Sequence, residues 1–451
     1  MKMKLTNVGA IKNLTLDLSK QMIILCGPNN TGKTYAAYSV YSLRLFFSNS
    51  KLLPKSFLRF FNAGNFTEHF DITHYYQEHF EEYIIWLNQH YPEFFQAVFG
   101  ENSSKFTKAT AEILLPKDDF LARIVDEETE FFLKIDEVIQ RISHKTQGAS
   151  VVEFTSPNTL ADEQTLLLIL SHLQGIFLRR FLRNYIIFPT ERTAITIFSK
   201  ELSLKRNYLV DKMLEFRDRG GLENPLEWLE KRATRYTLPV SDNLAIAEDS
   251  VQLQKTTSKF AFLADDIETM LGGSLDLSKD GEMQFKPKRS KEKLGLHLSG
   301  SMVKSLSSLV FYFRHRAEEN DSIIIDEPEM NLHPDNQRKI ARILAKAANS
   351  GLQVIVSTHS DYFIREINNC IMLSHPAFEG KDSKHEYGFE DNMVLKPETV
   401  GAYFFSSKGE SYSLPMEENG FEVETIDNEI IALNEESNAI YHTLLMAESE
   451  P

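Results

Sequence analysis

The first 48 residues alternate between short apolar segments and polar turns, a pattern typical of strands joined by loops. Apolar side chains occupy every second position in 3–6 and 14–18, which predicts two half-buried strands. The run Met22–Cys26 is apolar throughout, as expected for a strand covered on both faces of a parallel sheet. A glycine-containing loop follows, and helical spacing returns from about 32 to 47. We therefore predict three strands, a loop and a helix for this segment.

A second regular pattern lies in the later half of the chain. From 301 onward, helical spacing alternates with two strands at 322–325 and 353–357 whose central residues are all apolar, and another apolar strand is predicted at 185–188. Alternation of helices with fully apolar strands predicts a parallel α/β sheet with helices on both faces. No internal repeat or low-complexity tract interrupts this pattern.

The segment between these two patterns has a different character. Residues 49–185 are rich in aromatic side chains at helical spacing, and we interpret them as a large, mainly helical insertion with a strand pair near 109–115 and 151–154. The aromatic side chains are best explained as core. The apolar stretch 165–178 is too short to span a bilayer and is read as a buried helix. Three histidines spaced by five residues do not share one helix face, so we expect no metal site there.

The remaining segments lack such clear periodicity. We predict a charged helix over 200–235, a helix over 263–270 and a hairpin over 274–287. Residues 286–293 hold five basic side chains and one acidic one, and an exposed loop is the expected structure, with a nucleic-acid contact as the alternative. The tail, 390–451, is expected to hold short strands and a last helix. One row of that helix follows a 4-3-4-3-4 spacing, which predicts a narrow seam that packs on the body or on a partner; its members are Ile426, Ile430, Leu433, Ser437, Ile440 and Leu444.

Composition narrows the class of protein. The chain has 451 residues and a formal net charge of −15, so it is no general binder of polyanions. Its two cysteines, Cys26 and Cys370, are far apart and form no CxxC pair, which argues against a zinc site or a disulfide framework and favours a cytoplasmic protein. We find no signal peptide and no membrane span in the pattern.

The loop after the strand Met22–Cys26 carries the most specific chemistry. It reads Gly27, Pro28, Asn29, Asn30, Thr31, Gly32, Lys33 and Thr34. The spacing G-x-x-x-x-G-K-[ST] between a buried strand and a helix predicts a phosphate-binding loop for ATP. Glycines allow backbone amides to approach the phosphates, and the helix start adds a positive dipole end. Lys33 would neutralise the terminal phosphates, and Thr34 would ligate Mg²⁺.

Two further strand ends carry polar residues that suit the same nucleotide. Asp326 and Glu327 follow the apolar strand at 322–325, where Asp326 would hold Mg²⁺ and Glu327 would act as general base toward the attacking water. His359 follows the strand at 353–357, with room for one helix between Glu327 and that strand. We expect His359 to lie beside the terminal phosphate of ATP at the neighbouring strand end, as a switch residue.

The segment 298–302 completes a set of four motifs. It reads Leu-Ser-Gly-Ser-Met and precedes the helix that leads to Asp326. Together and in this order the motifs resemble the ATP-binding head of ABC-type ATPases, whose signature sequence is Leu-Ser-Gly-Gly-Gln. The resemblance implies that Ser299, Gly300 and Ser301 contact the terminal phosphate of ATP bound to a second subunit. Which of the two serines makes the contact stays open.

Other residues resemble a narrower group, the OLD-like and AAA-fifteen-like ATPases of bacteria. These are Phe188-Pro189-Thr190-Glu191-Arg192-Thr193, the Val303-Lys304-Ser305-Leu306 stretch and the sequence from Asp326 to Pro334. The resemblance covers 1–48, 186–200 and 263–367. Most ABC-type heads place a glutamine after the strand at 185–188, and its absence here leaves Glu191 or Arg192 to take its place. The loop 331–334 is expected to link the two sites across a dimer.

The resemblance implies a role as well as a fold. We expect an ABC-type P-loop head, a mixed and largely parallel sheet flanked by helices, with parts at 1–48 and 186–389, an insertion at 49–185 and a C-terminal part at 390–451. Family members without a nuclease of their own resemble the ATPase subunits of bacterial anti-phage (abortive infection) systems. Such a subunit would form a homodimer or a higher even-numbered oligomer, respond to a phage-derived trigger and control a separate nuclease or toxin.

Two alternatives remain from the sequence. One is a DNA-maintenance or repair ATPase that acts directly on nucleic acid. The other is a scaffold that binds ATP without hydrolysing it, although the intact Lys33, Asp326 and Glu327 argue against it. We expect no Toprim nuclease unit after 390, because no D-x-D pair occurs there.

Overall fold

The computed structural model describes most of the chain, and every statement below concerns its described residues. These are 1–48, 69–100, 106–124, 129–135, 138–146, 150–154, 183–198, 237–248, 250–278, 281–379 and 383–449. The predicted helix over 200–235 and the apolar stretch 165–178 lie outside them.

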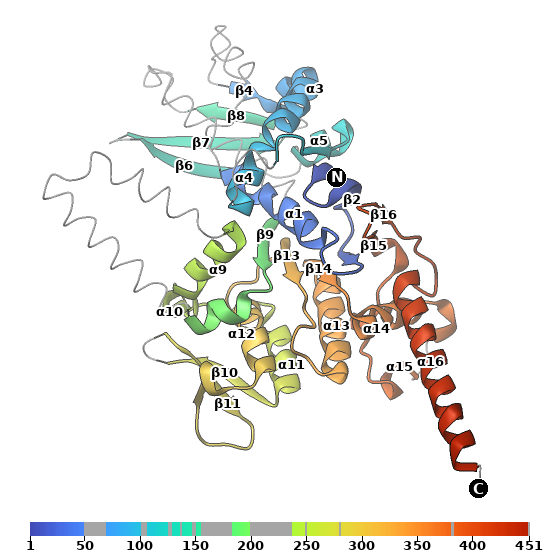
Figure 1. The fold of residues 1–451 in the computed structure, drawn as a ribbon. Helices are drawn as coiled ribbons and strands as arrows, with labels where there is room; N and C mark the ends of the chain where they lie inside the picture. The colour runs from blue at the N-terminus through green and yellow to red at the C-terminus, as the bar shows by residue number, and fades with distance from the viewer. Residues whose placement is uncertain are drawn as a thin grey trace, which may run out of the picture.

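A six-stranded sheet forms the centre of the molecule (Figure 1). Its order is β16 (Ser411–Ser413), β15 (Val400–Phe405), β3 (Met22–Cys26), β14 (Gln353–Thr358), β13 (Asp321–Asp326) and β9 (Asn184–Phe188). Every neighbouring pair is parallel except β15 and β16, so the sheet is mixed and largely parallel, as predicted.

Alternate residues of the central strands pack into two separate cores. On β3, Ile23 and Leu25 belong to one core, whereas Met22 and Ile24 belong to the other. The first core contains α1 (Lys33–Ser48) and the second contains α11 (Ala261–Leu271), α12 (Ser301–His315), α13 (Pro334–Asn349) and α14 (Asp361–Met372). Because successive strand side chains point to opposite faces, an all-apolar strand requires this cover on both sides.

A second sheet extends the first core. It has the order β2 (Ile11–Asp17), β1 (Lys2–Val8), β5 (Thr110–Leu114), all antiparallel. The strands near 109–115 and 151–154 were both predicted, but the expectation that they pair with each other was wrong. Thr110–Leu114 pairs with β1, whereas β8 (Ser150–Phe154) pairs elsewhere. Cross-strand partners depend on which elements the chain brings alongside, and a local pattern does not contain that information.

The insertion combines helices with a sheet of its own. Its helices are α3 (Ile72–His90), α4 (Glu93–Phe99) and α5 (Lys117–Ile124), and its antiparallel sheet has the order β4 (His69–Asp71), β8, β7 (Val138–Thr146), β6 (Thr129–Ile135). The mainly helical interpretation did not foresee β6 and β7. The aromatic residues are core, as predicted, because Tyr76, Phe80, Tyr91 and Phe95 are all buried.

Smaller elements complete the head. The predicted hairpin is β10 (Gly273–Leu277) with β11 (Met283–Pro287), and β12 (Leu294–Gly295) adds a third strand. The remaining short elements are α9 (Leu238–Glu248), α10 (Ser250–Leu253), η3 (Leu296–Leu298), η4 (Pro376–Phe378), α15 (Ser383–Glu386), η5 (Asp391–Met393) and η6 (Pro397–Thr399).

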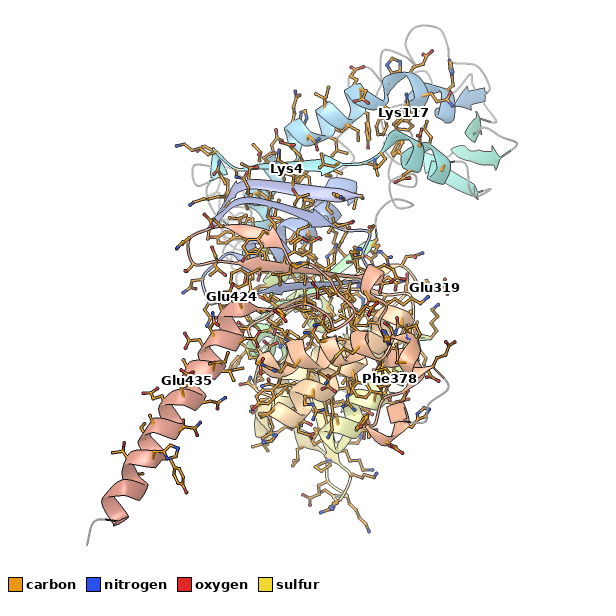
Figure 2. All side chains as sticks on the ribbon, turned by 90° about the vertical axis from the view of Figure 1, so that its right-hand side faces the viewer. Lys4, Lys117, Glu319, Phe378, Glu424 and Glu435 are labelled. Carbon is orange, nitrogen blue, oxygen red and sulfur yellow. The ribbon has the colours of Figure 1, made fainter. Side chains whose placement is uncertain are left out.

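The last helix, α16 (Glu424–Ser449), extends away from the body, as both views show (Figures 1 and 2). Its base is held to α14 by an ion pair between Arg365 and Asp427, with 2.8 Å between nitrogen and oxygen. Farther along, Leu433, Ile440 and Leu444 are 62%, 57% and 59% exposed. The predicted seam therefore does not pack on the body beyond the first turns of the helix.

Candidate functional site

The loop between β3 and α1 has the backbone of a phosphate-binding loop. Gly27 and Gly32 adopt φ angles of 134° and 109°, a region that side chains with a Cβ rarely occupy. A Cβ on Gly27 would also lie 2.3 Å from the carbonyl oxygen of Phe405 on β15. The loop conformation thus requires glycine at both positions, and it delivers the chain to a helix that begins at Lys33.

Lys33 is buried within this loop. Its Nζ donates hydrogen bonds to the carbonyl oxygens of Gly27 at 2.7 Å and Pro28 at 2.6 Å. Burial lowers the pKa of Lys33, while the nearby carboxylates of Glu327 and Asp326 oppose that shift. An ammonium group held against the loop in this way is placed to meet a phosphate that enters the loop.

The predicted Mg²⁺ residues come together across two neighbouring elements. The Thr34 hydroxyl donates to Asp326 Oδ2 at 3.1 Å, and the Ser357 hydroxyl donates to Asp326 Oδ1. Burial raises the pKa of Asp326, and these two hydroxyl groups favour its ionised form. A carboxylate beside a threonine hydroxyl is an oxygen donor set that suits Mg²⁺, which takes few ligands from protein. The residues present therefore fit the ion.

Glu327 and His359 face each other at the ends of β13 and β14. Glu327 Oε1 lies 3.4 Å from His359 Nδ1. The hydrogen bond from His359 lowers the pKa of Glu327, and the same bond raises the pKa of His359. Glu327 adopts φ 52°, a left-handed conformation that is uncommon for a residue with a side chain, and its amide donates to the carbonyl oxygen of Ser357 at 3.1 Å. This backbone conformation sets the direction of its carboxylate.

Arg192 occupies a different place from the one that the sequence suggested. It is 2% exposed, and its guanidinium donates to the carbonyl oxygens of Asp326 at 2.6 Å, Glu327 at 2.6 Å and Ser305 at 3.0 Å. Burial lowers the pKa of Arg192 to about 10. Main-chain carbonyl groups of α12 and of the end of β13 thus occupy the guanidinium, so it is not available to hold an attacking water. Of the two candidates for the missing glutamine, only Glu191 has an exposed side chain.

The signature segment lies at the start of α12. Ser299 is 8% exposed and its hydroxyl donates to the carbonyl oxygen of Gly295 at 3.2 Å. Gly300 is the N-cap of the helix, and Ser301 is exposed at its first position. Among the described residues, no hydrogen bond joins either serine to the phosphate-binding loop. The segment accordingly presents a helix N-terminus to the outside of its own chain.

One residue of the cluster was not assigned a role from the sequence. Glu329 is 4% exposed and accepts hydrogen bonds from the Thr358 hydroxyl at 2.6 Å and the His359 amide at 3.1 Å. The repeated acid in Asp-Glu-Pro-Glu was the available signal, but spacing alone does not show which strand end a carboxylate reaches.

Other expectations concern the surface. Lys286 at the end of β11, and Lys288, Arg289, Lys291 and Lys293 in the loop after it, are all exposed, as predicted. Within the part of the chain that the structure describes, no group of three or more His, Cys, Asp or Glu side chains is arranged to hold a metal ion. None of the described helices is long and apolar enough to cross a membrane.

Comparison with known proteins shows which family this chain matches. Residues 1–364 match the AAA_15 family, described as an AAA ATPase domain. Over 73 residues the chain is 38% identical to the "OLD nuclease" of Thermus scotoductus (strain ATCC 700910 / SA-01), a match that spans 16% of this chain and 13% of that protein.

Two solved structures are among those similar to this chain. The Smc head domain with an extended coiled coil, bound to the C-terminal domain of ScpA and derived from Pyrococcus furiosus, is 14% identical. That alignment covers 96% of this chain and 98% of the other, with a TM-score of 0.33. The SMC head domain from Thermotoga maritima is 12% identical, with coverage of 92% and 98% and a TM-score of 0.32.

Proposed function

The chain belongs to the AAA ATPase domain family, and we propose that it binds and hydrolyses ATP with Mg²⁺ as the regulatory subunit of a bacterial anti-phage system. In this proposal the protein acts in the cytoplasm, senses a phage-derived trigger and controls a separate nuclease or toxin. The observation that supports the ATPase part is the convergence of Lys33, Thr34, Asp326, Glu327 and His359 at the ends of three adjacent parallel strands.

The chemistry follows from the roles of these side chains. Mg²⁺, when bound, supplies positive charge that offsets the charge of the phosphate oxygens. Thr34 and Asp326 would hold that ion, and Lys33 would neutralise the terminal phosphates. Glu327 would accept a proton from the attacking water. The hydrogen bond from His359 lowers the pKa of Glu327 and so keeps this carboxyl group ionised. His359 orients the Glu327 carboxylate by its hydrogen bond.

The exposed signature segment supports function as a dimer. A helix N-terminus with exposed Ser301 is suited to meet a phosphate, yet no described contact joins it to the phosphate-binding loop of its own chain. In a two-fold dimer each chain would offer this segment to the ATP of the other. ATP between the two chains would then favour a closed dimer, and loss of the terminal phosphate would release it.

A mixing experiment tests hydrolysis across the dimer. Ser301→Glu places a negative charge where the phosphate would bind, and acidic residues at a helix start do not harm folding. We expect Ser301→Glu alone to lower ATP turnover by about 10²-fold, and Glu327→Gln alone to lower it by roughly 10²–10⁴-fold. Mixed in equal amounts, the two proteins should regain measurable turnover, since each mixed dimer then holds one intact pair of half-sites.

Absence of recovery in the mixture, with wild-type turnover present, would contradict sites shared between chains. Absence of turnover in the wild type itself would contradict ATP hydrolysis. Each variant is first checked for wild-type thermal unfolding, so that neither result is a folding effect.

Three observations support the proposal that this chain controls an effector. The family resemblance points to it, a short match links the chain to an OLD nuclease, and α16 offers exposed hydrophobic side chains from a base that is tied to α14. Since α14 begins at Asp361, two residues after His359, a nucleotide-dependent shift of His359 would be passed along α14 to α16.

The test of effector control is co-purification of the chain with the products of its native flanking genes, with and without ATP. A nuclease-like or toxin-like protein that binds in one nucleotide state only would support the proposal.

A second candidate function is a DNA-maintenance ATPase. The exposed basic side chains of 286–293 favour it, because such a patch can contact phosphates even on an acidic protein. Duplex DNA that stimulates ATP turnover, with loss of that stimulation when Lys288, Arg289 and Lys291 are changed to Gln, would support this function. Unchanged turnover with DNA would contradict it.

A further inference from the structure

Glu329 joins the loops that follow two neighbouring strands. It lies in the turn after β13, and its Oε1 accepts hydrogen bonds from two groups that follow β14, the Thr358 hydroxyl at 2.6 Å and the His359 amide at 3.1 Å. The same oxygen lies 3.9 Å from His359 Nδ1. One carboxylate oxygen therefore touches both the backbone and the ring region of the switch histidine.

A carboxyl group at this position is costly to the fold. Glu329 is 4% exposed, and its second oxygen, Oε2, finds no hydrogen-bond partner among the described residues. Burial raises the pKa of Glu329. A buried carboxyl with one oxygen unsatisfied destabilises a protein relative to an apolar side chain of similar volume. Packing alone therefore does not account for a glutamate here.

The neighbours of Glu329 indicate what it does for the site. Glu327, two residues earlier, pairs with the His359 ring at 3.4 Å. Arg192 donates a hydrogen bond to the carbonyl oxygen of Glu327 and so holds the main chain at that residue. His359 has its amide held by Glu329 and its ring by Glu327. The bond to Glu329 is the only described hydrogen bond between the main chain of His359 and the loop after β13.

We propose that Glu329 is a positioning residue that holds His359 in register with Glu327, so that the pair distinguishes ATP from ADP. This inference rests on the proposed function, because it assigns the contact with the terminal phosphate to His359. ADP lacks that phosphate, so a loosened His359 should weaken ATP binding and hydrolysis and leave ADP binding unchanged. A misplacement of about 1 Å at such a residue can lower turnover by about 10²-fold.

The test compares three variants of the full chain. Glu329→Ala removes both accepted hydrogen bonds, whereas Glu329→Gln keeps an oxygen that can accept them. The matched control is Glu366→Gln, because Glu366 on α14 is equally buried at 1% exposed but is engaged by Arg338 and Arg342 away from the site. For each variant we would measure kcat and KM for ATP, the binding constants of ATP and ADP, and thermal unfolding.

We expect Glu329→Ala to lower kcat by at least about tenfold and to reduce the ratio of ATP to ADP affinity. Glu329→Gln should keep most of the wild-type kcat and most of the wild-type ratio of ATP to ADP affinity. Glu366→Gln should change neither kcat nor that ratio. If Glu329→Ala does not fold, we would measure kcat and the ratio of ATP to ADP affinity in Thr358→Val, which removes one of the two donors to Glu329. The expected losses in kcat and in that ratio are the same.

Wild-type kcat and affinity ratio in the alanine variant would overturn the inference. An equal loss of ATP and ADP affinity in Glu329→Ala would also overturn it, because a purely structural role has that effect. The two proposals fail separately: a wild type that neither binds nor hydrolyses ATP contradicts the proposed function, whereas an active wild type with silent Glu329 variants contradicts only this inference.

Discussion

Several side chains at the carboxyl ends of the central strands are buried, whereas most of those on the C-terminal helix α16 are exposed. At the strand ends, Lys33, Asp326 and Arg192 are buried and each is engaged by several hydrogen bonds from its own chain. On α16, Leu433 and Ile440 are more than half exposed, and the helix carries six acidic side chains and no lysine or arginine. In the first region, contacts within one chain hold each of these three side chains in place. In the second region, water reaches these apolar side chains.

This difference has consequences for substitution. A change at Arg192 or Asp326 removes partners from groups that are almost fully buried, so it should alter chemistry or stability strongly. A change on α16 affects side chains that water already reaches, so it should alter association rather than folding.

The largest expected effect is on chemistry at Glu327. Glu327→Gln keeps the size of the side chain but removes the base, so we expect ATP binding to persist and hydrolysis to slow by roughly 10²–10⁴-fold. Phosphate release in steady state and equilibrium nucleotide binding measure the two quantities. Glu398→Gln, an exposed carboxyl far along the chain, is the control. Near-normal turnover in Glu327→Gln would assign the base to another group.

The next effect is on stability at Arg192. Arg192→Met leaves the carbonyl oxygens of Asp326, Glu327 and Ser305 without their donor, and we expect a loss of about 3 kcal/mol in the free energy of unfolding. Urea unfolding measures it. Leu433→Gln on α16 is the contrasting variant and should change stability by less than about 0.5 kcal/mol. Equal losses in both variants would remove the distinction between the two regions.

The smallest effect is a pH dependence from His359 and Glu327. The raised pKa of His359 implies stabilisation that is complete below its ordinary pKa of 6.5 and is lost as pH rises through the folded pKa. The lowered pKa of Glu327 implies stabilisation that is present above its ordinary pKa of 4.5 and is lost as pH falls through the folded pKa. The pair should therefore stabilise the fold most between pH 4.5 and 6.5.

Thermal unfolding of wild type and His359→Ala over a pH series measures this dependence. Because both groups are partly exposed, we expect a difference of about 0.2–1 kcal/mol in that window and less at pH 8.5. His442→Ala, at an exposed histidine on α16, is the control. A difference that is constant with pH would show that the two groups do not stabilise each other by charge.

The sequence by itself determined the strands that form the sheet centre and the residues that end them. The all-apolar runs in β3, β13 and β14, the glycines of the loop at 27–34 and the acids after β13 are local features, and local features predict strands, a phosphate-binding loop and polar strand ends. Parallel strands then place Lys33, Asp326 and His359 at one edge, because carboxyl ends of such strands coincide.

Only the tertiary structure decided which side chain touches which. The pairing of β5 with β1 depends on the path of the insertion, and the sheet formed by β6, β7 and β8 depends on partners that no local pattern names. Arg192 was one of two candidates for the place of the usual glutamine, and it donates to the carbonyl oxygen of Glu327. Glu329 was assigned no role, and it accepts a hydrogen bond from the His359 amide. Hydrogen-bond partners far apart in sequence are set by packing geometry, which emerges only when the helices and strands are assembled around the two cores.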